Sequence, residues 1–205
     1  MSKSFYTNVQ SLGSNILYRG VKDGKRIKAK IEYSPSLYIP SKRVTNLTSL
    51  DGDYLEQKIF GNIREARDYV KKFEDVSTVK IYGQTRFEYA YIAEHHHGMV
   101  DWDQDKILVG IIDIEVGSEN GFPDPYQANE PITAICLKLL PTNEVFVFGC
   151  GDFTTDREDV VYFKCKDEWS LCKKFLEIWG RFTPDALTGW NTKFFDIPYL
   201  VNRFR

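Results

Sequence analysis

The sequence lacks the marks of a secreted, membrane-spanning or strongly basic protein. Its cysteines form no C-x-x-C pair and no cysteine–histidine zinc spacing. No apolar run approaches the ~20 residues of a membrane helix, and the N-terminus has no apolar signal core. Lys and Arg number 27 against 29 Asp and Glu, so no basic excess indicates nucleic-acid binding. We therefore expect a cytoplasmic protein with reduced, buried thiols and no membrane contact.

The first half of the chain has the pattern of a small α+β domain. Its 205 residues, 42% apolar, suffice for one large domain or two small ones. Residues 4–33 alternate as strands do, and Asp23-Gly24 predicts a hairpin. Asn62 to Val76 predicts a helix with Asn62 as its cap and Glu65 as the reciprocal partner. Strands are expected near 78–82 and 86–93. The polar stretch that follows, with three consecutive histidines, favours a solvated linker and ends this domain, 1–105.

Residues 106–205 have a different pattern. The run 107–115 is almost continuously apolar, which is typical of a central strand buried on both faces. Further strands are predicted at 132–139, 145–148, 160–163 and 186–190. Helices are predicted at 167–180, with Gly180 as its stop, and from Asp196 onward. The apolar stripe of the first helix would be Trp169, Cys172, Leu176 and Trp179. This order is that of a mixed α/β sheet flanked by helices, a class that includes the ribonuclease H-like fold, although periodicity alone does not select it.

Two acids interrupt the apolar strand. Asp113 and Glu115 are two residues apart, so their side chains share one face of the strand. A carboxylate inside such a strand is costly unless something compensates its charge, and a divalent cation such as Mg²⁺ or Mn²⁺ does this well. The alternative is that the strand leaves the core at Asp113 and both acids are solvated at its end.

A third acid, Asp196, opens the last helix just before Ile197-Pro198. Taken alone it would be an ordinary helix N-cap. Together, two strand acids and a third at a later strand-to-helix junction could converge on one metal site.

These acids lie in two longer motifs. Gly110-Ile-Ile-Asp-Ile-Glu115 resembles the first exonuclease motif of family B DNA polymerases. The stretch from Leu187 to Arg203, with its Asn191 and Asp196, resembles the second. Gly121-Phe122-Pro123 and several N-terminal segments are similar to the T-even phage branch. The resemblance spans nearly the whole chain and implies an N-terminal domain followed by an incomplete ribonuclease H-like 3′→5′ proofreading exonuclease domain over residues 106–205.

The resemblance also implies residue roles. Asp113 would bridge two Mg²⁺ or Mn²⁺ ions, Glu115 would bind the first ion and Asp196 the second. The substrate would be the single-stranded 3′ end of mispaired DNA. Asn191 would hydrogen-bond the terminal nucleotide, and Phe122 and Phe195 would stack on or wedge between bases, although plain core packing is an equally good reading of both aromatics.

The family's third motif, Tyr-x-x-x-Asp, is absent, as are the polymerase carboxylates. We therefore expect the N-terminal part of a replicative DNA-directed DNA polymerase, truncated or naturally split, that has no appreciable nuclease activity alone. Its partners would be DNA and the remaining polymerase, in the host cytoplasm if a phage encodes it. The resembled family also implies RNA contact through the N-terminal domain, where five basic residues lie at 22–30. The alternatives are a non-catalytic module that binds nucleic acid or a partner, and a stand-alone nuclease of another ribonuclease H-like family.

Overall fold

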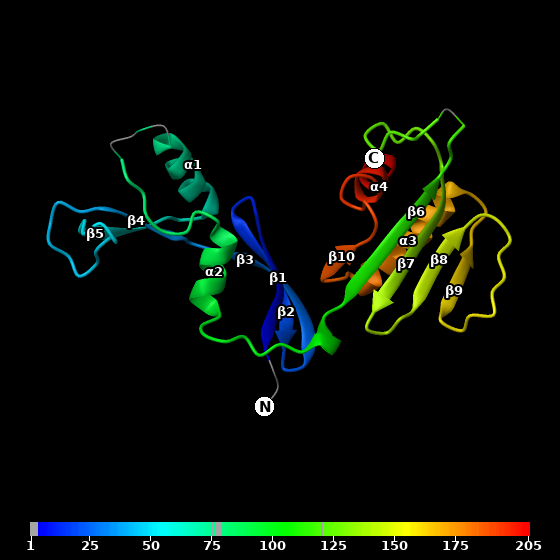
Figure 1. The fold of residues 1–205 in the computed structure, drawn as a ribbon, viewed down its shortest axis with the longest axis horizontal. Helices are drawn as coiled ribbons and strands as arrows, with labels where there is room; N and C mark the ends of the chain where they lie inside the picture. The colour runs from blue at the N-terminus through cyan, green and yellow to red at the C-terminus, as the bar shows by residue number, and fades with distance from the viewer. Residues whose placement is uncertain (1–3, 75, 77–78, 120) are drawn as a thin grey trace. The chain divides into compact units, whose positions relative to one another are not determined.

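The computed structural model describes residues 4–74, 76, 79–119 and 121–205. The chain forms two compact units, Met1–Asp103 and Gln104–Arg205 (Figure 1). The predicted division after residue 105 falls within the short 3₁₀ helix η1 (Gln104–Lys106), close to this boundary. In the described part of the chain, no helix is long and apolar enough to cross a membrane.

The N-terminal unit begins with an antiparallel three-stranded sheet. The expected hairpin at Asp23-Gly24 is confirmed, and both residues have positive φ angles of 52° and 74°, as a two-residue turn of this kind requires. A second, two-stranded antiparallel sheet follows. The strands are β1 (Phe5–Leu12), β2 (Asn15–Lys22), β3 (Lys25–Glu32), β4 (Ser36–Pro40) and β5 (Leu55–Ile59).

Helix α1 (Ile63–Phe73) confirms the predicted helix and its cap. The Asn62 side chain accepts a hydrogen bond from Glu65 N at 3.0 Å. The Glu65 carboxylate reaches back to Gly61 N and to the Asn62 side chain, instead of to Asn62 N as expected. The cap is still reciprocal, because Asn62 satisfies an open donor of the first helical turn and Glu65 accepts bonds from the two residues that precede the helix.

The strand predicted at 86–93 is wrong, because this segment forms helix α2 (Phe87–His95). Its buried residues Phe87, Ala90 and Tyr91 are three and four positions apart, which is the spacing of one helical face. Aromatic residues favour strands in general, and that preference misled the sequence prediction. Of the strand expected at 78–82, residue 78 lies outside the described residues, and the remainder forms only an isolated bridge between Tyr82 and Tyr38.

The three consecutive histidines are not all in a solvated linker. His95 belongs to the last turn of α2, and its ring stacks on Tyr91 with 4.1 Å between centroids. His96 lies against Tyr6 and Tyr18 of the first sheet, at 4.9 Å and 5.9 Å between ring centroids. Burial lowers the pKa of His96, and the neighbouring His95 lowers it further. These rings therefore attach the end of α2 to the β1–β2 hairpin.

The C-terminal unit is built on one five-stranded sheet in the order β10-β6-β7-β8-β9 (Figure 1). The outer pairs β10–β6 and β8–β9 are parallel, and the two inner pairs are antiparallel. This mixed sheet confirms the expected α/β class and suits a ribonuclease H-like domain. The strands are β6 (Val109–Val116), β7 (Ile132–Leu140), β8 (Val145–Gly149), β9 (Val160–Lys164) and β10 (Ala186–Thr188).

Helix α3 (Glu168–Phe182) packs across β7, β8 and β9, and the predicted stripe meets the core only in part, through Cys172 and Trp179. Leu171, Phe175 and Ile178 enter the core, whereas Trp169 is 70% exposed and Leu176 is 47% exposed. Gly180 does not end the helix, which continues to Phe182 and is capped by Thr183 in a left-handed conformation. The sequence shows two apolar stripes on this helix, and periodicity could not tell which of them meets the sheet.

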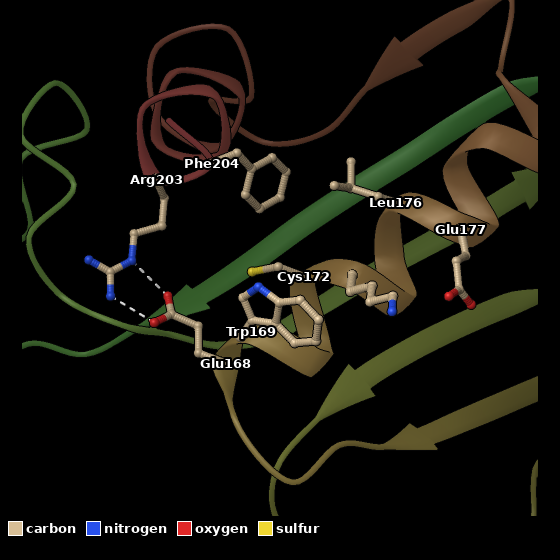
Figure 2. Close-up of a pocket in the computed structure, with 8 residues that line it drawn as sticks. Glu168, Trp169, Cys172, Leu176, Glu177, Arg203 and Phe204 are labelled. Atoms are coloured by element: carbon tan, nitrogen blue, oxygen red, sulfur yellow. Dashed lines mark hydrogen bonds and ion pairs between the residues drawn. The ribbon is translucent and has the colours of Figure 1, made fainter.

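The exposed stripe of α3 lines a groove of about 810 Å³ beside the end of helix α4 (Asp196–Arg203). Figure 2 shows Trp169, Cys172 and Leu176 on α3 and Phe204 opposite them. At one end of the groove, Arg203 forms a bidentate ion pair with Glu168, with both N–O distances 2.7 Å.

The Glu168–Arg203 pair joins three parts of the unit. Glu168 lies on α3 and also accepts a hydrogen bond from Ile132 N, at the start of β7, at 2.8 Å. Arg203 lies on α4 and also donates to the carbonyls of Ala128 and Asn129. The pair therefore connects both helices to the loop that leads from β6 to β7.

We expect the pair to contribute measurably to stability. The Arg203 guanidinium, assisted by Ile132 N, holds the pKa of Glu168 below its usual range, although burial opposes this effect. Glu168→Gln should lower the free energy of unfolding by about 1–2 kcal/mol near neutral pH. Because the folded-state pKa is depressed, this contribution is lost as pH falls through it, so the deficit should shrink in acid. Urea unfolding of the wild-type chain and the variant, near neutral pH and in acid, measures this difference in the free energy of unfolding.

Glu177→Gln is the matched control for Glu168→Gln. Glu177 lies on the same helix and pairs with Lys174 at 3.1 Å, but both side chains are about half exposed, so its loss should cost less than about 0.5 kcal/mol. An equal loss of stability in the two variants would contradict the role given to the Glu168–Arg203 pair.

Candidate metal-dependent nuclease site

Strand β6 places Asp113 and Glu115 on one face and Ile112 and Ile114 on the other. The two isoleucines are buried in the core, and both acids are exposed. The expectation of a strand buried on both faces is therefore wrong for this end of β6, although β6 is an interior strand of the sheet. The two carboxylates lie side by side on the open face and are solvated, as in the alternative reading, but the strand does not leave the core at Asp113, because Ile114 is still buried.

Strand β10 does not pair with the part of β6 that carries these acids. The parallel pairing of the two strands ends at Thr188 and Ile111. Gly189 then passes so close to β6 that a Cβ atom there would lie 2.3 Å from the Ile112 carbonyl oxygen. Only glycine fits this approach, and the chain then turns away toward α4. The backbone amides of β6 beyond Ile111 therefore need another partner on this edge.

Asp196 supplies that partner. Its Oδ1 atom accepts a hydrogen bond from Ile114 N at 3.1 Å, so the carboxylate lies against the strand between Asp113 and Glu115. The alternative of an ordinary N-cap is wrong, because Phe195 is the cap residue and Asp196 makes no capping bond. The structure thus brings the third acid to the strand that carries the other two.

Asp196 is only 2% exposed. Burial raises its pKa, the bond from Ile114 N opposes this, and the charges of Asp113 and Glu115 raise it further. A buried carboxylate next to two like charges is costly, and a divalent cation is the natural compensation. Carboxylate oxygens are the hard ligands that Mg²⁺ and Mn²⁺ prefer, so the residue types fit such ions.

The three acids interact through their charges, but they do not form a finished coordination shell. In the residues that the structure describes, no group of three or more His, Cys, Asp or Glu side chains is arranged to hold a metal ion. Like charges repel one another, and only a cation would draw their oxygens together.

The aromatic residues expected to contact DNA also meet here. Phe122, in the loop between β6 and β7, is 88% exposed, and its ring centroid lies 5.5 Å from that of Phe195. Phe195 is partly buried and packs on the core, so the core-packing reading holds for it but not for Phe122. Asn191 is exposed and adopts a positive φ of 55°, and its carbonyl accepts bonds from Phe194 N and Phe195 N.

The sequence prediction did not identify several residues that position the site. Tyr199 and Asn202 on α4 donate hydrogen bonds to the carbonyls of Glu130 and Pro125, at 2.6 and 3.0 Å, and so hold the Phe122 loop beside α4. Thr192 is buried beside Gly189, and its hydroxyl has no hydrogen-bond partner in the described part of the chain. The spacing of Tyr199, Asn202 and Arg203 could have shown that these polar residues share one face of a helix. Nothing in the sequence indicated that their partners were loop carbonyls.

Comparison with known proteins gives the family. The model of the DNA polymerase family B exonuclease domain matches residues 66–205. The DNA-directed DNA polymerase of Escherichia phage RB69 is 30% identical over 231 aligned positions, which cover 99% of this chain and 26% of that protein. The DNA-directed DNA polymerase of Enterobacteria phage T4 is 26% identical, and the alignment covers 99% of this chain and 25% of the T4 protein.

A more distant relative is the DNA polymerase catalytic subunit of Elephantid herpesvirus 1, 29% identical over 52% of this chain and 11% of that protein. The chain spans about a quarter of the length of the two phage relatives. The family match covers well over half of the residues, including all three acids. The chain belongs to the exonuclease-domain family of family B DNA polymerases, in its T4-like branch.

Proposed function

We propose that this chain carries part of the 3′→5′ proofreading exonuclease site of a replicative DNA-directed DNA polymerase. Exonuclease domains of this family depend on divalent metal ions. The observation that carries the proposal is the bond from Ile114 N to Asp196, which holds a buried third carboxylate beside Asp113 and Glu115 on β6.

In this proposal Asp113 and Glu115 would hold one Mg²⁺ or Mn²⁺ ion, and Asp113 and Asp196 would hold a second. Two such ions would stabilise the attacking and leaving oxygens of an in-line displacement at the last phosphodiester. Asn191 hydrogen-bonds the terminal nucleotide. Phe122 stacks on an unpaired base, with Phe195 behind it as support, because every base offers a π-face.

The partners proposed are the single-stranded 3′ end of DNA, the other domains of the polymerase, and RNA at the N-terminal unit. Strand β3 supports the RNA contact, because Lys25, Arg26, Lys28 and Lys30 are all exposed on it. The site of action would be the host cytoplasm, as the phage relatives suggest.

The second candidate is a module that binds nucleic acid or a partner without catalysis. The exposed positions of Asp113 and Glu115 and the absence of a finished metal cluster among the described residues favour it. The two candidates differ in whether the acids bind metal, which the first experiment below decides.

We expect Mn²⁺ to bind the wild-type chain and to bind much more weakly, by roughly tenfold or more, after Asp196→Asn or Asp113→Asn, because each variant removes a charged ligand. Isothermal titration with MnCl₂ measures this. Glu119→Gln is the matched control, since Glu119 is an exposed acid of the adjoining loop. Equal Mn²⁺ affinity in all four proteins would favour the non-catalytic module.

With Mg²⁺ alone, we expect these 205 residues to show no appreciable exonuclease activity, because the Tyr-x-x-x-Asp motif is absent from them. An end-labelled single-stranded oligonucleotide provides the assay. Degradation that disappears on Asp113→Ala would overturn this expectation, whereas degradation that survives the substitution would indicate a contaminating nuclease.

Phe122→Ala should weaken binding of a short single-stranded oligonucleotide by about 1–3 kcal/mol, the worth of one base stacked on an aromatic ring. Fluorescence anisotropy in EDTA measures the affinity independently of metal binding. Phe153→Ala, which removes a half-exposed aromatic ring that packs on Tyr162, should leave the affinity unchanged. Equal affinities of the two variants would exclude Phe122 from the DNA contact.

A further inference from the structure

All four cysteines are free thiols, and two of them lie next to each other at the ends of parallel strands. Strands β8 and β9 pair in a register that joins Phe148 to Phe163 and Gly149 to Lys164. The pairing continues one residue further, because Cys165 N donates to the Gly149 carbonyl at 2.8 Å. Cys150 and Cys165 are therefore the next pair across the two strands.

The positions of this pair, one residue beyond each strand, predict that their side chains share one face of the sheet. Phe148 and Phe163, two residues earlier, stack with their ring centroids 5.1 Å apart. Because side chains alternate along a strand, Cys150 and Cys165, which follow β8 and β9 directly, are expected on that same face. Neighbouring strands lie about 4.8 Å apart, which is within the Cα–Cα range of a disulfide. Burial raises the pKa of Cys165, and the charge of the nearby Cys150 raises it further.

The two thiols differ in access to solvent. Cys150 is exposed, whereas Cys165 is 8% exposed and donates a hydrogen bond to the Phe163 carbonyl. An oxidant in solution therefore reaches Cys150 first, and Cys165 is sheltered from it but adjacent to Cys150. An accessible thiol next to a second thiol is the arrangement of a site that oxidises reversibly to a disulfide.

We propose that Cys150 and Cys165 form a redox modification site whose oxidant is a peroxide. The Cys150 thiolate attacks one peroxide oxygen, the O–O bond breaks, and the leaving hydroxide takes up the proton that the thiol released, which gives a sulfenic acid and one water. The Cys165 sulfur then attacks the Cys150 sulfur, the S–O bond breaks, and a second water leaves with the Cys165 proton. Two thiols are oxidised to one disulfide while one hydrogen peroxide is reduced to two waters.

Such a bond would join the end of β8 to Cys165, which lies two residues before Asp167, the N-cap residue of α3. It lies on the opposite edge of the sheet from Asp113, Glu115 and Asp196, because β9 and β10 are the two outer strands. A test of the modification site therefore does not depend on whether the nuclease proposal is correct.

The experiment treats the folded 205-residue chain with hydrogen peroxide and counts thiols with Ellman's reagent after denaturation. The count should fall by two, dithiothreitol should restore it, and peptide mapping should find Cys150 linked to Cys165. Cys150→Ser should abolish the link and, because Cys150 is exposed, should still fold. Cys136→Ser is the matched control and should keep the link. In urea-unfolded chain the selectivity for this pair should disappear.

Three outcomes would overturn the proposal. One is oxidation of Cys150 to a sulfinic acid while Cys165 keeps its thiol. Another is a disulfide that links a different pair, such as one that includes Cys172 on α3. The third is a folded chain that loses no thiol at peroxide concentrations that oxidise the unfolded chain.

Discussion

The hydrogen bond from Ile114 N to the Asp196 carboxylate is the contact on which the C-terminal unit's site depends. It exists because β10 pairs with β6 only as far as Ile111, so the later amides of β6 have no strand partner on that edge. A buried backbone N–H without a partner is costly, and a side-chain acceptor removes that cost. The same bond sets where α4 begins, since Asp196 is its first residue.

At Asp196 the hydrogen bond that fixes the side chain and the electrostatic cost of burying it act in opposite directions. The bond to Ile114 N favours the charged carboxylate, whereas burial and the charges of Asp113 and Glu115 disfavour it, and burial is the largest effect. A fold selected only for stability would have a neutral hydrogen-bond acceptor at this position. A carboxylate there is understandable if a cation compensates the three charges, so the unfavourable electrostatics among these three acids are themselves an indication of function.

The sequence was informative where local chemistry decides structure. The Asp23-Gly24 turn, the Asn62 cap and the order of elements in the C-terminal unit followed from turn, capping and periodicity rules, and the motifs identified the three acids. It was misleading where tertiary packing decides. The aromatic segment of α2 suited either a strand or a helix until its burial was known. On α3 two apolar stripes competed, and the sheet covers Leu171 and Phe175 instead of Trp169 and Leu176. The contact of Asp196 with Ile114 spans distant parts of the chain, and no spacing rule predicts such a bond.

Helix α4 links the acids to the aromatic residues of the site. Its first residue holds the β6 edge, and its later residues Tyr199, Asn202 and Arg203 bind carbonyls of the loop that carries Phe122. Arg203 is in turn fixed by Glu168 on α3 (Figure 2). Eight residues therefore determine both where the carboxylate proposed to bind metal lies and where a base is proposed to stack. Because one helix sets both, a displacement of α4 would move the carboxylate and the aromatic pair together, and the spacing between the proposed metal ligands and the proposed position of the 3′ end depends on this helix more than on the exposed loop.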